Sequence, residues 1–303
     1  MSEIAVGSSF ETLERLACAL DASDDYRVLR RLRPKPPCRP PVDVSIRRAV
    51  FVDTETTGLD PVTDEIVELA MLAFDYSIDG TFLSPTASFD KLRDPGRPIS
   101  AEITALTGIT DEMVSGQSID PAEVAAFVAD AALVIAHNSA FDRGFCERLF
   151  PIFADKPWAC SLHEVNWKEQ GFEGMRLSQL VNAYGLFFEG HRALNDCEAG
   201  VELLSRPLPR SGGTALGALL ESARLPRWRI RAVGTPYVSR EMLKRRGYRW
   251  EGGTIDRKGA WCAEVADGDF DAECEFLRAE IYRRNDAVVD ARRLTAFERY
   301  SGR

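Results

Sequence analysis

One short segment, AVFVDTETTGLD, which runs from residue 49 to residue 60, carries both the fold signal and the chemistry of this chain. Its first half is a short apolar run, typical of a buried β-strand, and its second half has the Thr, Gly and Asp of a turn. Side chains two residues apart on a strand share a face, so we expect Asp53 and Glu55 to project together at the strand's end. Two carboxylates so close repel each other and raise each other's pKa unless a cation lies between them.

Such hard oxygen ligands suit Mg²⁺ or Mn²⁺. A solvated junction between a strand and a turn explains the same residues equally well when the segment is taken alone. A calcium EF-hand loop is a poor match, because its ladder of acidic residues and its terminal Glu are absent.

A second polar segment, HNSAFD, covers residues 137–142 and directly follows the apolar run LVIA at 133–136. Asn138 or Ser139 is suited to cap a helix that begins here, which places Asp142 in or near its first turn. The helix dipole favours an ionised carboxylate at that position, and ligands of open sheets gather at the carboxyl ends of strands. An ordinary cluster of helix-capping residues is the simpler explanation of this segment in isolation.

A third segment, HRALND, covers residues 191–196. His191 and Asp196 would diverge by about 140° if both lay on one helix, at 100° per residue. They converge only if His191 lies in the loop before the helix, which Gly190 allows. A capping imidazole is the alternative interpretation. The chain has only three histidines, and two of them, His137 and His191, lie in these polar segments, whereas we interpret His163 as structural or exposed.

The surrounding pattern predicts alternating strands and helices, and hence an α/β or α+β sheet layered with helices. Two further apolar segments, 65–74 and 86–92, indicate strands. Asp120-Pro121-Ala122-Glu123 is a strong helix start. Further helices are predicted at 10–20, 25–33, 139–149, 176–185, 191–207 and 270–284.

Charge is distributed unevenly along the 303 residues, whose net charge is −9. Residues 49–210 carry a net −15, whereas residues 27–48 and 221–262 each carry +7. An acidic core that recruits metal ions is compatible with basic flanks that hold a polyanion. A hydrophobic fraction of 45% excludes global disorder. No apolar run reaches the roughly 18 residues of a membrane span, and the acidic start is not typical of a secretory signal.

The seven cysteines are scattered and never spaced as CxxC, which argues against a disulfide framework or a zinc site and predicts a cytoplasmic protein.

Together the three polar segments resemble the motifs of the DEDDh 3′→5′ exonucleases, the family of the proofreading epsilon subunit of bacterial DNA polymerase III and of several RNA-trimming enzymes. The connecting segments 103–114 and 157–163 are also similar. The resemblance covers about 49–207 and implies a ribonuclease H-like fold, a mixed sheet flanked by helices. It implies that two divalent ions, Mg²⁺ or Mn²⁺, bind to four carboxylates, and that His191 is the general base. The four metal ligands by this resemblance are Asp53, Glu55, Asp142 and Asp196.

The resemblance also implies contacts with the terminal nucleotide of the substrate at Thr56, Gly58 and Leu59, with Asn138 and Phe141 beside the second motif. It predicts a metal-dependent exonuclease that releases nucleoside 5′-monophosphates from single-stranded DNA 3′ ends in proofreading or repair. A polymerase or a replication or repair protein is the expected partner. An RNA-trimming exoribonuclease is the alternative within the class. A non-catalytic replisome adaptor that binds 3′ ends is the alternative of another class, but it has no need of four clustered acids.

The predicted organisation has four parts: an N-terminal helical extension (1–33), a proline-rich linker (34–45), the exonuclease domain (46–207) and a small C-terminal α+β module (208–303). In the module, residues 221–262 interleave eleven basic residues with aromatic ones, a pattern suited to single-stranded nucleic acid. A small module whose aromatic side chains form its core, with a solvated basic face, is the alternative. LKRRGYRW and KGAW there resemble a small uncharacterised domain met beside nucleic-acid enzymes.

Overall fold

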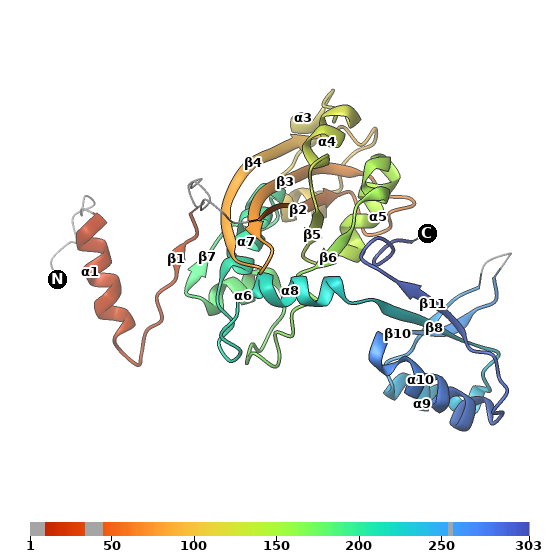
Figure 1. Ribbon diagram of the computed structural model, residues 1–303. Helices are drawn as coiled ribbons and strands as arrows, with labels where there is room; N and C mark the ends of the chain where they lie inside the picture. The colour runs from red at the N-terminus through yellow and green to blue at the C-terminus, as the bar shows by residue number, and fades with distance from the viewer. Residues whose placement is uncertain (1–9, 34–44, 254–256, 303) are drawn as a thin grey trace.

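The computed structural model describes residues 10–33, 45–253 and 257–302, and its centre is a five-stranded sheet (Figure 1). The strands are β2 (Ile46–Thr56), β3 (Ile66–Ser77), β4 (Phe82–Leu92), β5 (Leu133–Ala136) and β6 (Trp158–Cys160). Their spatial order is β4-β3-β2-β5-β6, with β2, β3 and β4 antiparallel and β5 and β6 parallel to β2. The predicted mixed sheet of a ribonuclease H-like fold is thereby confirmed.

Helices cover both faces of this sheet. One face packs against α6 (Leu177–Ala183), α7 (Ala193–Ser205) and α8 (Ala215–Arg224). The other packs against α4 (Pro121–Val128) and α5 (Ser139–Leu149). Side chains of β2 alternate between the two cores, with Phe51 toward α7 and Val52 toward α5. Asp53 and Glu55 therefore follow Phe51 onto the α7 face.

Helix α7 lies unusually close to β2 because its contact face is made of small side chains. A Cβ atom on Gly200 would come within 2.1 Å of the Phe51 ring. The Cys197 thiol lies 3.6 Å from the Phe51 carbonyl oxygen and 3.5 Å from that of Ala70. This approach places Asp196, in the first turn of α7, over the end of β2.

The connection from β4 to β5 carries the short helices α2 (Ala101–Thr107) and α3 (Asp111–Val114) before α4. The predicted start of α4 is confirmed: Pro121 is its first residue, and the Asp120 side chain accepts a hydrogen bond of 2.8 Å from the Ala122 amide. A 3-10 turn, η1 (Pro151–Asp155), links α5 to β6.

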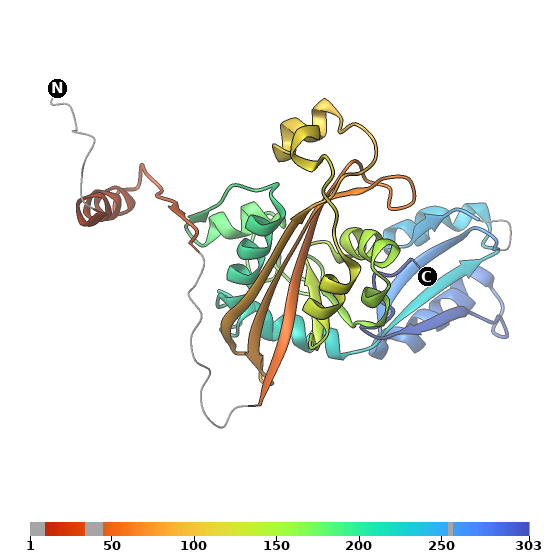
Figure 2. The same cartoon turned by 90° about the horizontal axis from the view of Figure 1, so that it is seen from above.

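The N-terminal extension differs from its prediction. Helix α1 (Phe10–Asp21) forms as expected, but none of its residues is buried and it stands away from the central sheet (Figures 1 and 2). The helix predicted at 25–33 is wrong, because Arg30–Arg31 form a strand, β1, that pairs in parallel with β7 (Leu186–Phe187). Pairing with β7, about 155 residues away in the sequence, therefore overrides the local helical pattern of residues 25–33. The predicted linker lies almost wholly outside the described residues.

The C-terminal part contains a four-stranded antiparallel sheet of order β11-β8-β10-β9. Its elements are β8 (Arg227–Val233), η2 (Tyr237–Ser239), α9 (Arg240–Arg245), β9 (Arg249–Glu251), β10 (Ala260–Ala266), η3 (Asp267–Asp269), α10 (Phe270–Phe276), the π-helical η4 (Leu277–Tyr282) and β11 (Asp290–Leu294). Tyr248 lies in the core of this sheet, and Trp228 and Trp261 pack against that core. These three aromatic residues fit the structural interpretation of the basic block, whereas Tyr237 and Trp250 are exposed.

The core around α7 extends beyond the predicted domain boundary between residues 207 and 208. Helix α8 packs through Leu216, Leu219 and Leu220 into the same core as α7. The last described residues also return to the central sheet after β11, since the Trp158 amide donates a 2.7 Å hydrogen bond to the carbonyl oxygen of Ala296. The four-stranded sheet is thus inserted between two segments, α8 and the last described residues, that both pack on the central sheet.

A buried cation anchors this returning segment, which we call the C-terminal strap (residues 295–301). Arg299 and Glu164 are both fully buried and form an ion pair of 2.8 Å. The Tyr300 hydroxyl donates a 2.8 Å hydrogen bond to the other oxygen of Glu164. The guanidinium of Arg143, also fully buried, donates to the carbonyl oxygens of Arg299 and Phe297 at 2.6 and 2.7 Å.

Replacing Arg299→Met should lower the free energy of unfolding by about 3–5 kcal/mol, because it leaves the Glu164 carboxylate buried without its counter-ion. Urea unfolding followed by tryptophan fluorescence measures the effect. Arg293→Met is the matched control, since it breaks only the half-exposed pair with Asp267 and should cost at most about 1 kcal/mol. Equal stability of the two variants would contradict the structural role of the strap.

Candidate active site

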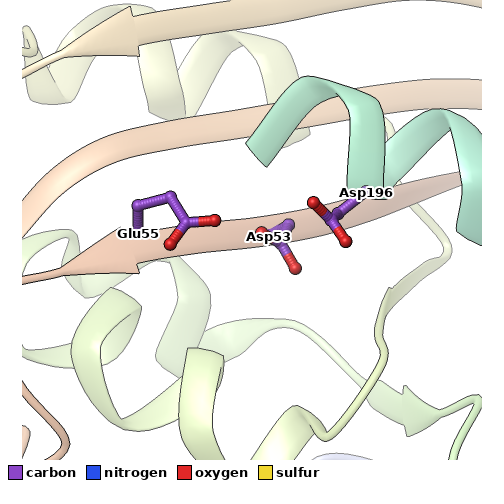
Figure 3. Close-up of side chains that lie close together, drawn as sticks. All are labelled: Asp53, Glu55 and Asp196. Carbon is purple, nitrogen blue, oxygen red and sulfur yellow. The ribbon is translucent and has the colours of Figure 1, made fainter. Parts of the chain in front are cut away.

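Three carboxylates meet at the end of β2, beneath the first turn of α7. Asp53 and Glu55 come from β2 and Asp196 from α7, and one oxygen of each lies within 4.8 Å of the others (Figure 3). The shared strand face predicted for Asp53 and Glu55 is confirmed. No ordinary helix cap or solvated turn requires three acids to converge in this way.

Burial, together with repulsion from neighbouring carboxylates, raises the pKa of all three groups. The pKa of Asp53 lies well above its usual range, first because of burial and then because of the negative charges of Asp142 and Asp196. Burial, followed by repulsion from Asp196 and Glu68, raises the pKa of Glu55 to about 8. Burial also raises the pKa of Asp196 to about 6. A positive charge at the centre of the cluster would remove this penalty.

The oxygen atoms fit a divalent cation. Oδ2 of Asp196 is buried, and no hydrogen-bond partner reaches it from the described residues. A buried, unpartnered carboxylate oxygen is costly unless a ligand binds it. An all-oxygen, all-carboxylate donor set is the type preferred by Mg²⁺ and Mn²⁺. Asp53, Glu55 and Asp196 are therefore the residues that could hold such an ion.

Asp142 lies beside this cluster and is held by β2. It occupies the first turn of α5, as the sequence predicts, and Oδ1 accepts hydrogen bonds of 3.1 Å from the amide and 2.9 Å from the hydroxyl of Thr54. Burial raises its pKa to about 7, although the bonds from Thr54 oppose that shift. Thr54 lies between Asp53 and Glu55 in sequence, so one strand positions three of the four predicted ligands.

His191 lies in the loop before α7, where the sequence places it. The helix begins at Ala193, and His191 is exposed with a positive φ of 63°. Its side chain lines an open cleft of about 680 Å³ together with Asp196, Phe188 and His137. The Asn195 side chain holds the loop through a 2.8 Å hydrogen bond to the carbonyl oxygen of Glu189. An imidazole thus stands in the same cleft as the Asp196 carboxylate.

The ion pair of Glu68 and Arg192 is a part of the site that the sequence analysis missed. Glu68, fully buried on β3, pairs with Glu55 across the sheet and forms a 2.6 Å salt bridge with Arg192. Its other oxygen accepts a 2.8 Å hydrogen bond from the Ala193 amide, the first residue of α7. Glu68 therefore fixes both the start of α7 and the residue after His191. Glu68 lies on the strand next to β2, so no local sequence pattern connected it with the predicted site.

The residues predicted to contact substrate lie around the site rather than along the cleft. Leu59 is 83% exposed at the turn after β2, and the Thr56 hydroxyl donates a 2.6 Å hydrogen bond to the carbonyl oxygen of Gly58. Asn138 is exposed and has a φ of 91°, but its side chain does not cap α5. The Phe141 ring packs against Phe145 at 4.9 Å. Their contacts with substrate remain predictions.

The other two histidines, His137 and His163, lie in different surroundings. His137 lines the cleft, where its ring nitrogens lie 2.9 Å from the Ser161 hydroxyl and 2.8 Å from the carbonyl oxygen of Met175. Burial lowers its pKa to about 4. A neutral, doubly hydrogen-bonded His137 is therefore a structural part of the cleft wall. His163 is exposed, which agrees with its interpretation from sequence.

Without metal, the protein should become less stable as the pH rises from about 5 to 8. Asp53, Glu55, Asp142 and Asp196 have folded-state pKa values raised above the ordinary 3.8 or 4.5, so the folded state binds more protons than the unfolded state in this range. The free energy of unfolding falls with pH wherever that holds. Millimolar Mg²⁺ or Mn²⁺ should raise the Tm more at pH 8 than at pH 5, because the ligands must be deprotonated. Thermal melts with cation or with EDTA test this, and an equal shift at both pH values would contradict it.

The part of the chain that the structure describes contains no helix both long and apolar enough to cross a membrane. The cysteines at positions 18, 146, 160, 197, 262 and 274 are free thiols.

Comparison with known proteins finds an exonuclease family, DNA polymerase III proteins and solved exonuclease structures. A family model described as RNase T, exonuclease, matches residues 50–204. The DNA polymerase III PolC-type protein of Latilactobacillus sakei is 38% identical over 164 residues, which are 51% of this chain and 11% of that protein. A DNA polymerase III subunit epsilon-like protein of Rhodobacter capsulatus is 34% identical over 187 residues, which are 58% of this chain and 26% of that protein. The chain thus spans about a tenth to a quarter of the length of these relatives.

Among solved structures, exonuclease X in complex with 5′ overhanging duplex DNA is 27% identical. The match covers 57% of this chain and 99% of that one, with a TM-score of 0.44. Exonuclease I is 18% identical, and the match covers 61% of this chain and 48% of that one with a TM-score of 0.46.

Proposed function

The chain belongs to the RNase T exonuclease family, and on this basis we propose that it is a metal-dependent 3′→5′ exonuclease that releases nucleoside 5′-monophosphates from DNA. The observation that supports this most is the meeting of Asp53, Glu55 and Asp196 beside an open cleft that His191 also lines. The unpartnered, buried Oδ2 of Asp196 supports a bound cation at the same place.

Each residue has a distinct role in this proposal. Asp53, Glu55, Asp142 and Asp196 hold two divalent cations, Mg²⁺ or Mn²⁺, which supply Lewis-acid stabilisation of the charge that develops on the phosphate. His191 takes a proton from the attacking water, a task suited to an imidazole near neutral pH. Glu68, through Arg192 and the Ala193 amide, positions the loop that carries His191. The cleft admits the terminal nucleotide of a strand.

DNA is the proposed substrate, and an RNA-trimming activity is the alternative. The relatives named as DNA polymerase III proteins favour DNA, in proofreading or repair and with a polymerase or replication protein as partner. The cytoplasm is the proposed location, which the scattered cysteines support. A non-catalytic adaptor that only binds 3′ ends is disfavoured, because binding alone does not need converging carboxylates.

The test is degradation of single- and double-stranded DNA and RNA oligonucleotides that carry a label at either end, with Mg²⁺, Mn²⁺ or EDTA. We expect single-nucleotide shortening from the 3′ end of DNA, with 5′-monophosphate products and no reaction in EDTA. Shortening from the 5′ end, or full activity in EDTA, would overturn the proposal. Faster degradation of RNA than of DNA would select the alternative substrate.

A further inference from the structure

A second hollow lies beside the catalytic cleft. This side groove has a volume of about 760 Å³ and is bounded by Arg27, the segment 170–174, helix α6 and Arg210. Gln179 on α6 lines both the side groove and the cleft, so the two hollows share a wall. Arg176 lines the cleft close to this shared wall. The side groove therefore adjoins the cleft at Gln179.

Arginine side chains surround the path from the cleft into the side groove. Arg27, Arg176 and Arg210 are all exposed, and none of the three takes part in a salt bridge among the described residues. Arg27 donates a 2.5 Å hydrogen bond to the carbonyl oxygen of Asn182, and Arg210 donates one of 2.9 Å to that of Glu169. These backbone contacts orient both guanidinium groups without neutralising them, and they leave further N–H donors available.

The walls of the side groove are held in place by side-chain hydrogen bonds. Oε1 of Gln170 accepts bonds of 3.0 and 3.1 Å from the amides of Arg210 and Ser211, which fix this turn against the segment 170–174. The Tyr184 ring packs against Phe172 at 5.5 Å, and its hydroxyl donates a 2.8 Å bond to the carbonyl oxygen of Pro207. The side groove thus combines cations with half-buried aromatic rings, the combination that binds single strands.

We propose that the side groove binds the sugar–phosphate backbone of a single strand upstream of the 3′-terminal nucleotide in the cleft. The inference rests on the proposed function and adds to it a substrate-binding surface to which the N-terminal extension contributes Arg27. Residues 49–210 carry a net charge of −15, so a polyanion that approaches the site needs local cations. Glu173 is the single acidic residue among those that line the side groove.

The experiment compares substrates of different length on the full-length double variant Arg27→Ala/Arg210→Ala. The p-nitrophenyl ester of thymidine 5′-monophosphate and a dinucleotide reach only the cleft, whereas a 15-nucleotide strand reaches the side groove. We expect unchanged kcat and KM for the short substrates and a KM raised roughly tenfold for the 15-mer. The slope of log kcat/KM against log salt should fall by about 1.4 for the 15-mer, since each single-strand phosphate contact contributes about 0.7.

Two comparison variants sharpen the test. Arg245→Ala/Arg284→Ala removes the same charge from the C-terminal part and should leave both KM and slope unchanged. Arg27→Lys/Arg210→Lys keeps the charge and should retain most of the wild-type slope. The proposal is overturned if the alanine variant binds the 15-mer like the wild type, or if the C-terminal variant loses as much affinity. A wild-type protein that hydrolyses neither the ester nor any strand would instead overturn the proposed function.

Discussion

Asp53→Asn and Asp196→Asn should each reduce the rate of phosphodiester hydrolysis by roughly 10³-fold or more at saturating Mg²⁺. Each substitution keeps the shape of the side chain but removes one of three converging negative charges. The Tm of the metal-free variants should rise above that of the wild type, because repulsion among the buried carboxylates is relieved. Addition of Mg²⁺ should then raise the Tm less than it does in the wild type.

Glu198→Gln is the matched control for these variants. Glu198 lies two residues after Asp196 on α7, is half-buried, and does not belong to the carboxylate cluster. It should keep wild-type turnover and the wild-type response of the Tm to Mg²⁺. Near-normal turnover by both Asp53→Asn and Asp196→Asn would contradict the assignment of the site.

His191→Ala should lower kcat by roughly 10²–10⁴-fold, the range expected for loss of a general base. The variant should still bind DNA and should show the wild-type rise of the Tm in Mg²⁺, because His191 is exposed in the cleft and is not one of the three clustered ligands. Rates measured at saturating DNA test this.

His163→Ala removes an exposed imidazole outside the cleft and serves as the comparison. It should retain the rate of the wild type. If His191→Ala also retained that rate, another group would have to accept the proton.

Local sequence predicted those parts of the site that depend on backbone periodicity. The spacing of Asp53 and Glu55 placed both on one face of a strand, and the geometry of a helix placed His191 in the loop before α7. The predicted start of α5 placed Asp142 in or near the first turn of that helix. Each of these predictions needs only a few neighbouring residues and an element of known repeat.

Contacts between segments that are far apart in the sequence could not be predicted in this way. Nothing near Glu68 indicates that it pairs with Arg192, 124 residues away. The pairing of β1 with β7 and the return of the C-terminal strap were missed for the same reason. A chain that ended at Ser211 would therefore lose more than the four-stranded sheet, because α8 and the C-terminal strap, which pack on the central sheet, would also be missing.

The C-terminal strap has a consequence for the order in which the protein can be made. Glu164 and Arg143 reach their buried partners only when residues 295–301 exist, about ninety residues after the end of α7. At a synthesis rate of roughly 5–20 residues per second, the ribosome needs about 5–20 s to add that stretch. During this interval the nascent nuclease has all its proposed catalytic residues but lacks the last piece of its core. The protein should therefore reach its full stability only after residues 295–301 have been translated. Only then should its active site stay permanently assembled.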